Sequence, residues 1–240
     1  MSDAIVIIPT YNEIENIESI IRAVFSQQKN FHVLVVDDNS PDKTGEKVKA
    51  LQEEFDNQLF LLERKEKNGL GVAYISGFKW CLEKIYDYIF EMDADFSHNP
   101  KDLVRLYNAC AIDGADLSVG SRYVKGITVV NWPMTRIILS YGASRYVRLI
   151  TRMKVKDSTA GFVCYKRAVL EAIDLEKIKF VGYAFQIEMK FKAYKKGFKI
   201  VEIPVIFKDR TKGKSKMSGS IISEAIFGVI SLKLKSLFAK

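Results

Sequence analysis

The sequence predicts an α/β fold in which helices flank a mostly parallel central sheet. Apolar runs alternate with helical patterns along the first half of the chain, as expected for successive βαβ units. The runs are continuously apolar, which indicates strands that are covered on both faces. Connections are short and no low-complexity linker interrupts them, so one compact domain is expected to about Lys208.

Composition narrows the possible partners and sites. Of 240 residues, 48% are hydrophobic, which supports a large core, and the net charge of +8 favours a nucleic acid, membrane surface or phosphorylated substrate. Three scattered cysteines and two histidines argue against a disulfide framework, a zinc site or a histidine-rich metal site, and fit a reducing cytosol. We find no secretory signal and no apolar segment of the roughly 18 to 20 residues that span a membrane.

Hydrophobic runs and turn residues give the order of elements. The predicted strands are Ala4–Ile8, His32–Val36, Leu59–Leu62, Tyr88–Met92, Ala115–Val119, Phe162–Tyr165 and Lys199–Val205. The predicted helices are about Glu13–Gln27, Lys43–Phe55, Leu70–Lys84, Pro100–Ile112 and Met134–Met153, with another beginning at Phe185. The tail from Ser218 to Lys240 is amphipathic and suits either a helix in a membrane interface or one packed on the domain or a dimer partner.

Polar residues follow the first and second strands. After the first, Thr10 is a candidate helix cap, whereas Tyr11 can stack on a base or sugar and Glu13 can accept from a ribose hydroxyl. After the second, Asp37 and Asp38 are adjacent carboxylates that the following turn does not account for. An acidic residue at such a strand end can bind a ribose or a base edge.

The glycine-containing segment 67–74 follows the third strand. It resembles a dinucleotide fingerprint, but Tyr74 stands where the third glycine belongs and the segment follows the wrong strand. We therefore reject NAD binding and expect either a turn that starts a helix or a close approach to an anion.

The fourth strand ends in an Asp-x-Asp motif. Asp93 and Asp95 supply two hard oxygen ligands, which suit Mg²⁺ or Mn²⁺ held against a diphosphate, and Ser97 can add an oxygen. The alternative is that both aspartates simply start a loop.

Arginines follow the fifth strand. Arg122 stands at the strand end, and Arg136 and Ser140 share a helix face, so the three can grip one phosphate. Pairing of Arg122 with a structural carboxylate is the alternative. The loop Val124–Pro133 suits a mobile lid or a membrane contact. A basic stripe, solvated or membrane-facing, is formed by Arg145, Arg148 and Arg152.

The ordered set of motifs resembles a known family. Residues 9–13, 36–42, 93–98 and 120–123, extended by 157–162, 182–186 and 209–216, are similar to inverting A-fold glycosyltransferases, most closely polyprenol (dolichol) phosphate mannosyltransferases. The resemblance implies a Rossmann-like nucleotide-diphospho-sugar transferase (GT-A) fold, with a catalytic domain at residues 1–216. The pattern of the tail predicts an amphipathic C-terminal helix at 217–240. The resemblance further implies GDP-mannose as donor, polyprenyl or dolichyl phosphate as acceptor, no nucleic-acid partner, and a peripheral position on the cytoplasmic face of a membrane.

The resemblance also implies residue roles. The nucleotide would be held by Pro9, Tyr11, Glu13, Val36, Asp37, Asp38, Asp93, Ala94, Arg210 and Lys216. The metal, Mg²⁺ or Mn²⁺, would lie at Asp93, Asp95 and Ser97, and the catalytic set would be Asp95, Arg122, Arg136 and Ser140. Many members carry membrane helices or need membrane subunits, so an anchoring subunit stays open here.

A phosphate acceptor explains why no base is evident in the sequence. A phosphate monoester is already anionic near neutral pH, so it can attack the anomeric carbon without a general base. Three alternatives stay open: glucosyl transfer from UDP-glucose, sugar-nucleotide binding without turnover, and a basic nucleic-acid-binding protein. Salt-sensitive nucleic-acid binding without sugar-nucleotide binding would favour the last.

Overall fold

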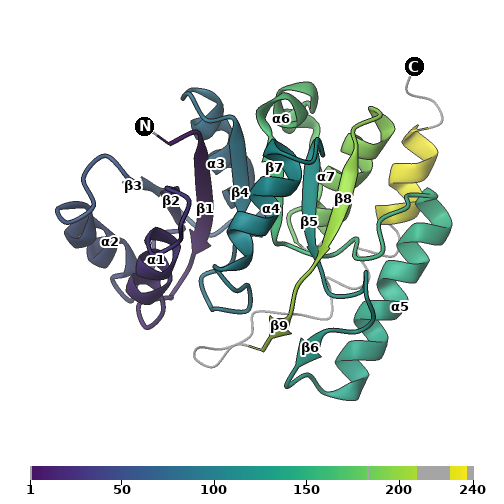
Figure 1. The fold of residues 1–240 in the computed structure, drawn as a ribbon, viewed down its shortest axis with the longest axis horizontal. Helices are drawn as coiled ribbons and strands as arrows, with labels where there is room; N and C mark the ends of the chain where they lie inside the picture. Colours follow the sequence, from purple (N-terminus) through teal and green to yellow (C-terminus); the bar gives the residue numbers. More distant parts are fainter. Residues whose placement is uncertain (1, 183, 210–227, 237–240) are drawn as a thin grey trace.

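A seven-stranded sheet forms the centre of the computed structural model, which describes residues 2–182, 184–209 and 228–236 (Figure 1). The strand order is β3-β2-β1-β4-β7-β5-β8. The strands are β1 (Ala4–Thr10), β2 (His32–Asp37), β3 (Leu59–Glu63), β4 (Tyr88–Glu91), β5 (Leu117–Ser121), β7 (Val163–Lys166) and β8 (Ile200–Pro204). All seven predicted strands are present, and no observed strand end differs from its predicted position by more than two residues.

Only β7 runs against its neighbours, which confirms the mostly parallel sheet. It pairs antiparallel with β4 on one side and with β5 on the other, while β1, β2, β3 and β4 pair in parallel, as do β5 and β8. Consequently β1, β2, β4 and β5 all end at one edge of the sheet, and β7 begins at that same edge. Ligands bind beyond the carboxyl ends of strands in such sheets.

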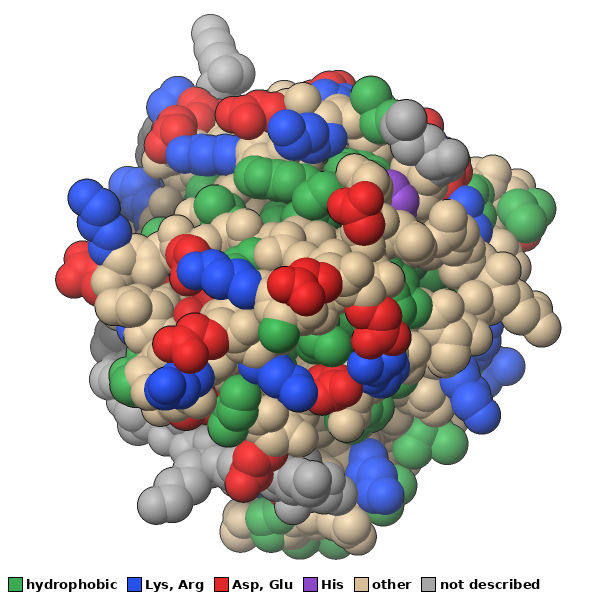
Figure 2. All heavy atoms as spheres, turned by 90° about the vertical axis from the view of Figure 1, so that its left-hand side faces the viewer, with side chains coloured by type: hydrophobic (Ala, Val, Ile, Leu, Met, Phe, Trp, Pro, Cys, Tyr) green, Lys and Arg blue, Asp and Glu red, His purple; other side chains and the backbone are tan. Residues whose placement is uncertain are grey.

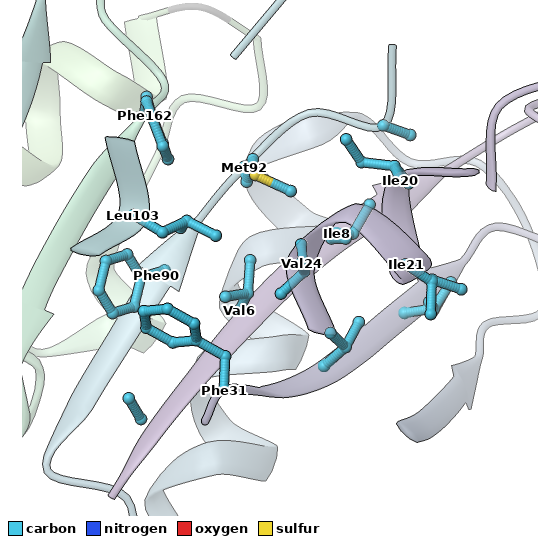
Figure 3. Packing of buried hydrophobic residues seen from close by; sticks show 14 of the residues in the cluster. Val6, Ile8, Ile20, Ile21, Val24, Phe31, Phe90, Met92, Leu103 and Phe162 are labelled. Atoms are coloured by element: carbon cyan, nitrogen blue, oxygen red, sulfur yellow. The ribbon is translucent and has the colours of Figure 1, made fainter. Parts of the chain in front are cut away.

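Helices cover both faces of the sheet. On one face lie α1 (Ile17–Phe25), α2 (Thr44–Gln52) and α4 (Asp102–Ala111), whose apolar residues pack with the alternate side chains Val6 and Ile8 of β1 (Figure 3). On the other lie α3 (Leu70–Leu82), α6 (Arg167–Ala172) and α7 (Ala184–Lys195), which pack against Ile5 and Ile7. The sequence analysis missed α6 and the short 3-10 helix Leu175–Lys177.

The long helix α5 (Met134–Thr151) stands beside the sheet rather than on it (Figure 1). Residues 228–236 are helical and lie alongside α5, where Val229 packs with Val147 of α5 and Ile187 of α7. The other tail residues that we predicted to be amphipathic helix lie outside the described part of the chain.

The expected lid at Val124–Pro133 is in part a strand. Within it, β6 (Val129–Val130) pairs in parallel with β9 (Phe207–Lys208) in a two-stranded sheet. The backbone N–H groups of Phe207 and Asp209 donate to the carbonyl groups of Thr128 and Val130. Tertiary pairing with a segment some 80 residues away therefore orders a stretch that the sequence left as a loop.

Substitution of Phe90 on β4 tests the packing of the sheet against α1, α2 and α4. Its ring is fully buried and meets Phe31 edge-on, with 5.4 Å between centroids. We expect Phe90→Ala to lower the free energy of unfolding by about 3–5 kcal/mol, measured by urea denaturation. Ile112→Ala is the control because Ile112 is 73% exposed, and it should change stability by less than about 0.5 kcal/mol. Equal stability of the two variants would contradict this packing.

Candidate functional site

A cavity of about 680 Å³ opens at the sheet edge where β4 and β5 end, and α5 forms one of its walls. It collects the predicted metal and acceptor residues, namely Asp93, Asp95, Ser97, Arg122, Arg136 and Ser140. These residues come from three separate parts of the sequence. Their meeting in one cavity follows from the strand order, since β4 and β5 are parallel and separated only by β7.

The loop after β4 holds the two aspartates in a tight turn. Asp95 is buried, and its Oδ1 accepts a hydrogen bond from the backbone N–H of Ser97 at 3.0 Å. Asp93 lies directly above the strand end and is half-buried. The Ser97 hydroxyl is buried and has no hydrogen-bond partner in the part of the chain that the structure describes. Ser97 thus brings an unpaired hydroxyl to the lining of the cavity.

His98 stabilises this turn through a hydrogen bond to its backbone. Its Nδ1 accepts a hydrogen bond from the backbone N–H of Asp93 at 3.1 Å, and its ring stacks on Phe162 at 4.9 Å. Burial lowers the pKa of His98 to about 4, although the nearby carboxylate of Asp95 opposes the shift. His98 is thus a neutral structural residue at neutral pH.

Arg122 is held by a buried carboxylate. Its Nε and Nη2 donate to Asp157 at 2.7 and 2.6 Å, and Nη2 also donates to Thr159 at 2.9 Å. The alternative of a carboxylate-paired arginine is therefore correct, yet Arg122 also lines the cavity. Asp157 can reach it because the chain entering the antiparallel strand β7 lies at the same sheet edge.

Arg136 and Ser140 face the cavity from the first turns of α5. Arg136 pairs with Asp209 at 2.9 Å, and its guanidinium lies 4.0 Å from the centroid of the Trp132 ring. The Ser140 hydroxyl accepts a hydrogen bond from Tyr123 at 2.7 Å. Each residue is thus positioned by a neighbour before any ligand binds.

The predicted nucleoside residues gather at the ends of β1 and β2, outside the cavity lining. Tyr11 lies under the ammonium group of Lys67 at 4.4 Å, and Glu13 accepts a hydrogen bond from Asn16 at 3.0 Å. Asp38 pairs with Arg64 at 2.8 Å. Burial is the largest cause of the raised pKa of Asp38, and Arg64 opposes it. Pro9 and Val36 lie in β1 and β2, and Ala94 stands between the two aspartates.

Asp37 is engaged within the protein. Its carboxylate accepts hydrogen bonds from the Thr10 hydroxyl at 2.7 Å and from the backbone N–H and hydroxyl of Ser40 at 2.9 and 2.6 Å. These bonds tie β1 to the turn after β2. Arg210 and Lys216, the other predicted nucleotide residues, lie outside the described residues.

A buried polar network beneath the aspartates escaped the sequence analysis. Gln186 on α7 donates to Glu91 of β4 at 2.5 Å and accepts from Lys190 at 3.1 Å, and Lys190 also donates to the Ala160 carbonyl at 2.6 Å. Burial raises the pKa of Glu91 to about 7 and lowers that of Lys190 to about 8. The network joins β4 to the segment that holds Asp157. In the sequence, the network is indicated only by Gln186 and Lys190, which are four residues apart and therefore share a face of a helix that is otherwise rich in apolar residues.

Glu188, left unassigned by the sequence, stabilises the backbone beside α7. It accepts from the backbone N–H groups of Lys179 and Phe180 at 2.9 and 3.2 Å and pairs with Lys192 at 3.2 Å. The glycine segment after β3 likewise starts a helix, since Gly69 has φ +101° and Gly71 N–H donates to the Val181 carbonyl at 2.8 Å.

Comparison with known proteins gives consistent matches. Residues 5–174 match the model of glycosyl transferase family 2. A polyprenol monophosphomannose synthase from Mycolicibacterium smegmatis is 47% identical over 94% of this chain and 84% of its own length. An undecaprenyl-phosphate mannosyltransferase from Micrococcus luteus is 45% identical over 93% of this chain and 90% of its own.

Two solved structures share the fold at 16% identity. Glucosyl-3-phosphoglycerate synthase from Mycobacterium tuberculosis, in complex with Mn²⁺, UDP and glucosyl-3-phosphoglycerate, has a TM-score of 0.68 over 99% of this chain and 81% of its own. A Pyrobaculum calidifontis mannosyltransferase in complex with GDP-Man and Mn²⁺ has a TM-score of 0.60 over 98% of this chain and 74% of its own. At this identity the likeness concerns the fold alone.

Substitution of Lys190 tests whether the buried polar network stabilises the fold. Lys190→Met leaves Glu91 and Gln186 without their cationic partner, so the free energy of unfolding should fall by about 3–5 kcal/mol in chemical denaturation. Glu91→Gln together with Lys190→Met removes both charges and should be less destabilising. Lys195→Met, an exposed position on the same helix, is the control. A Lys190→Met variant as stable as this control would refute the importance of the network.

Proposed function

Because the chain belongs to glycosyl transferase family 2, a family of enzymes with the GT-A fold, we propose that it transfers mannose from GDP-mannose to polyprenyl or dolichyl phosphate. The product would be a β-mannosyl phosphoryl polyprenol. The observation that carries the proposal is one cavity that is lined both by the Asp-x-Asp motif after β4 and by the arginines Arg122 and Arg136. The names of the mannosyltransferase relatives supply the sugar and the class of acceptor.

The aspartates suit a divalent metal. Asp93, Asp95 and the partnerless Ser97 hydroxyl offer hard oxygen ligands, which fit Mg²⁺ or Mn²⁺. The described residues contain no group of three or more His, Cys, Asp or Glu side chains able to hold a metal, so diphosphate oxygens would complete the site. When bound, the metal would neutralise negative charge on the departing nucleotide. Mn²⁺ in the two structural relatives supports this assignment.

The nucleoside would lie beyond β1 and β2. Tyr11 offers a ring for stacking, and Glu13 and Asp38 offer carboxylates for ribose or base donors. Asp37 would act by keeping these strand ends together, through its bonds to Thr10 and Ser40. Arg210 and Lys216 are proposed to contact the diphosphate from the segment after β9.

Arg122, Arg136 and Ser140 would orient the acceptor phosphate. Two anionic groups must approach each other in this reaction, and cations placed beforehand reduce their repulsion at the moment of attack. The phosphate needs no deprotonation, since its second pKa is about 6. Its oxygen would attack the anomeric carbon in line as GDP leaves, which inverts the α-linked donor to a β-product.

The wall of the cavity beside the arginines is apolar. It is formed by α5 residues that include Ile138, Leu139, Ala143 and Val147. Arginines next to an apolar wall fit an acceptor that joins a phosphate to a hydrocarbon chain. The arginines would bind the phosphate, and the hydrocarbon chain would bury its apolar surface against the wall, which is favourable. A small polar acceptor would leave this wall unused.

The outer face of α5 suits a membrane surface. Met134, Leu149 and the tail residue Leu234 are exposed. Arg145 and Arg148 are exposed on α5 between the first two, and Arg152 is exposed directly after the helix. Apolar side chains that enter the interface, together with cations that meet anionic lipid, are the features of interfacial helices. No helix in the described residues has the length and apolarity needed to cross a membrane. We therefore propose a peripheral position on the cytoplasmic face, with or without an anchoring subunit.

Nucleic-acid binding is the weaker alternative. Figure 2 shows the face at the α2–β3 end of the sheet, where basic and acidic side chains are intermixed. Ion pairs such as Arg22–Glu54 and Lys49–Glu63 account for part of this pattern. The face therefore offers no continuous basic surface to a phosphate backbone.

Transfer of labelled mannose from GDP-mannose to polyprenyl phosphate, with Mg²⁺ or Mn²⁺ and with EDTA, tests the proposal directly. UDP-glucose in parallel separates mannose from glucose transfer. A metal-dependent mannosyl lipid is the expected product. A glucosyl lipid would correct the donor, and nucleotide binding without product would favour the non-catalytic alternative.

Asp95→Asn should abolish this transfer while the protein stays folded. We expect the rate to fall at least about 100-fold, since stabilisation of charge by a metal is worth several kcal/mol. Asp113→Asn, an exposed site outside the cavity lining, is the control and should retain the wild-type rate. Full activity of the Asp95 variant would exclude the metal assignment.

Leu149→Glu should weaken binding to vesicles that contain phosphatidylglycerol. Leu149 is 78% exposed, and replacing an inserted leucine by a carboxylate should reduce partitioning by roughly tenfold in a sedimentation assay. Ile112→Glu, at a 73% exposed position directly after α4, should bind like wild type. If both variants partition alike, the face of α5 does not contact the membrane.

A further inference from the structure

Arg122 and Arg136, the arginines that line the cavity in the described part of the chain, lie close to one indole ring. Trp132 follows β6 and precedes α5, and its ring centroid is 4.0 Å from the Arg136 guanidinium and 5.4 Å from that of Arg122. Phe207 of β9 meets the same ring edge-on, with 5.2 Å between centroids. Trp132 is thus held from one side and contacts the two arginines that the proposed function assigns to the acceptor phosphate.

The ring contacts the two arginines without a hydrogen bond. A cation over an aromatic face is attracted by about 0.5–2 kcal/mol, and this attraction to the π-electrons needs no hydrogen-bond acceptor on the ring. Asp157 and Asp209 take some of those N–H groups in the plane. Trp132 therefore orients the arginines without competing for hydrogen bonds that a phosphate would need.

The indole N–H is itself a candidate donor. Trp132 lines the cavity, and its Nε1 is buried with no hydrogen-bond partner in the described part of the chain. A buried donor left without an acceptor costs about 1–3 kcal/mol, so such groups are usually satisfied by a ligand or water. A phosphate oxygen between Arg122 and Arg136 is a strong acceptor of the right charge.

We propose that Trp132 belongs to the acceptor-phosphate site, where its ring positions Arg122 and Arg136 and its Nε1–H donates to a phosphate oxygen. The inference rests on the proposed function and adds a residue to the acceptor side of it. It replaces the expectation that this tryptophan contacts a membrane or moves with a lid.

Two substitutions separate the ring from its N–H. Trp132→Phe keeps an aromatic face and removes the donor, so the KM for polyprenyl phosphate should rise about tenfold, the scale of a hydrogen bond to a charged group. Trp132→Leu also removes the aromatic face and should lower kcat as well. The KM for GDP-mannose should stay within about twofold in both, since only the acceptor side is altered.

Trp80→Phe is the matched control, because Trp80 on α3 packs against Phe60 of β3 and is not part of the cavity lining. Circular dichroism and unfolding midpoints confirm that each variant is folded. Acceptor kinetics of Trp132→Phe equal to those of Trp80→Phe would overturn the proposal. An equal rise in the KM for GDP-mannose would also overturn it, because that result places the N–H on the donor side.

Fluorescence gives a reading that does not depend on catalysis. The chain has two tryptophans, so Trp80→Phe leaves Trp132 as the sole indole emitter. Titration with a short-chain polyprenyl phosphate should change its emission saturably without donor, and Arg136→Gln should weaken that binding. No change up to a saturating acceptor concentration, as set by the KM, would refute the contact.

The two assays also separate this inference from the proposed function. Saturable quenching in a protein that transfers no mannose would retain the Trp132 site and reject the reaction. Mannose transfer that is insensitive to Trp132→Phe would retain the reaction and reject the site.

Discussion

The common edge at which β1, β2, β4 and β5 end is the constraint on which the site depends. It places Asp93 and Asp95 across one intervening strand from Arg122, so groups of opposite charge line a single cavity. The antiparallel strand β7 adds to this arrangement, since its entering segment brings Asp157 to the same edge. An enzyme that joins two anions needs both charge types within reach of one reacting centre.

Buried polar groups hold in place both the acidic part of this sheet edge, after β4, and the part that carries Arg122, after β5. The Arg122–Asp157 pair fixes the cationic half, and Glu91, Gln186 and Lys190 fix the segment beneath the acidic half. Charges in such positions are expensive unless they are paired and hydrogen-bonded, and here each has several partners. The family membership and the geometry agree: a glycosyltransferase fold brings the aspartates that follow β4 and the arginines Arg122 and Arg136 to one cavity.

Much of the sheet and the acidic motif could be predicted from sequence, because buried strands and strand-end carboxylates are local patterns. Arg122 was predicted at the cavity, but its partner Asp157 depends on a contact across 35 residues. Trp132 looked like an exposed loop residue, since nothing in its neighbourhood reveals that β6 pairs with β9. Lys190 was not recognised in the sequence, because burial of a lysine is decided by tertiary packing.

The central claim is that the metal and the acceptor phosphate occupy one cavity. Phosphorus NMR of a short-chain polyprenyl phosphate, bound to the enzyme with Mn²⁺ and GDP, tests it most directly. A paramagnetic ion shortens the relaxation time of a nearby nucleus, so the acceptor resonance should broaden strongly in wild type. It should sharpen again when Asp95 is replaced by Asn. If the acceptor binds saturably but its phosphorus resonance is unaffected by Mn²⁺, the two sites lie apart and the account is contradicted.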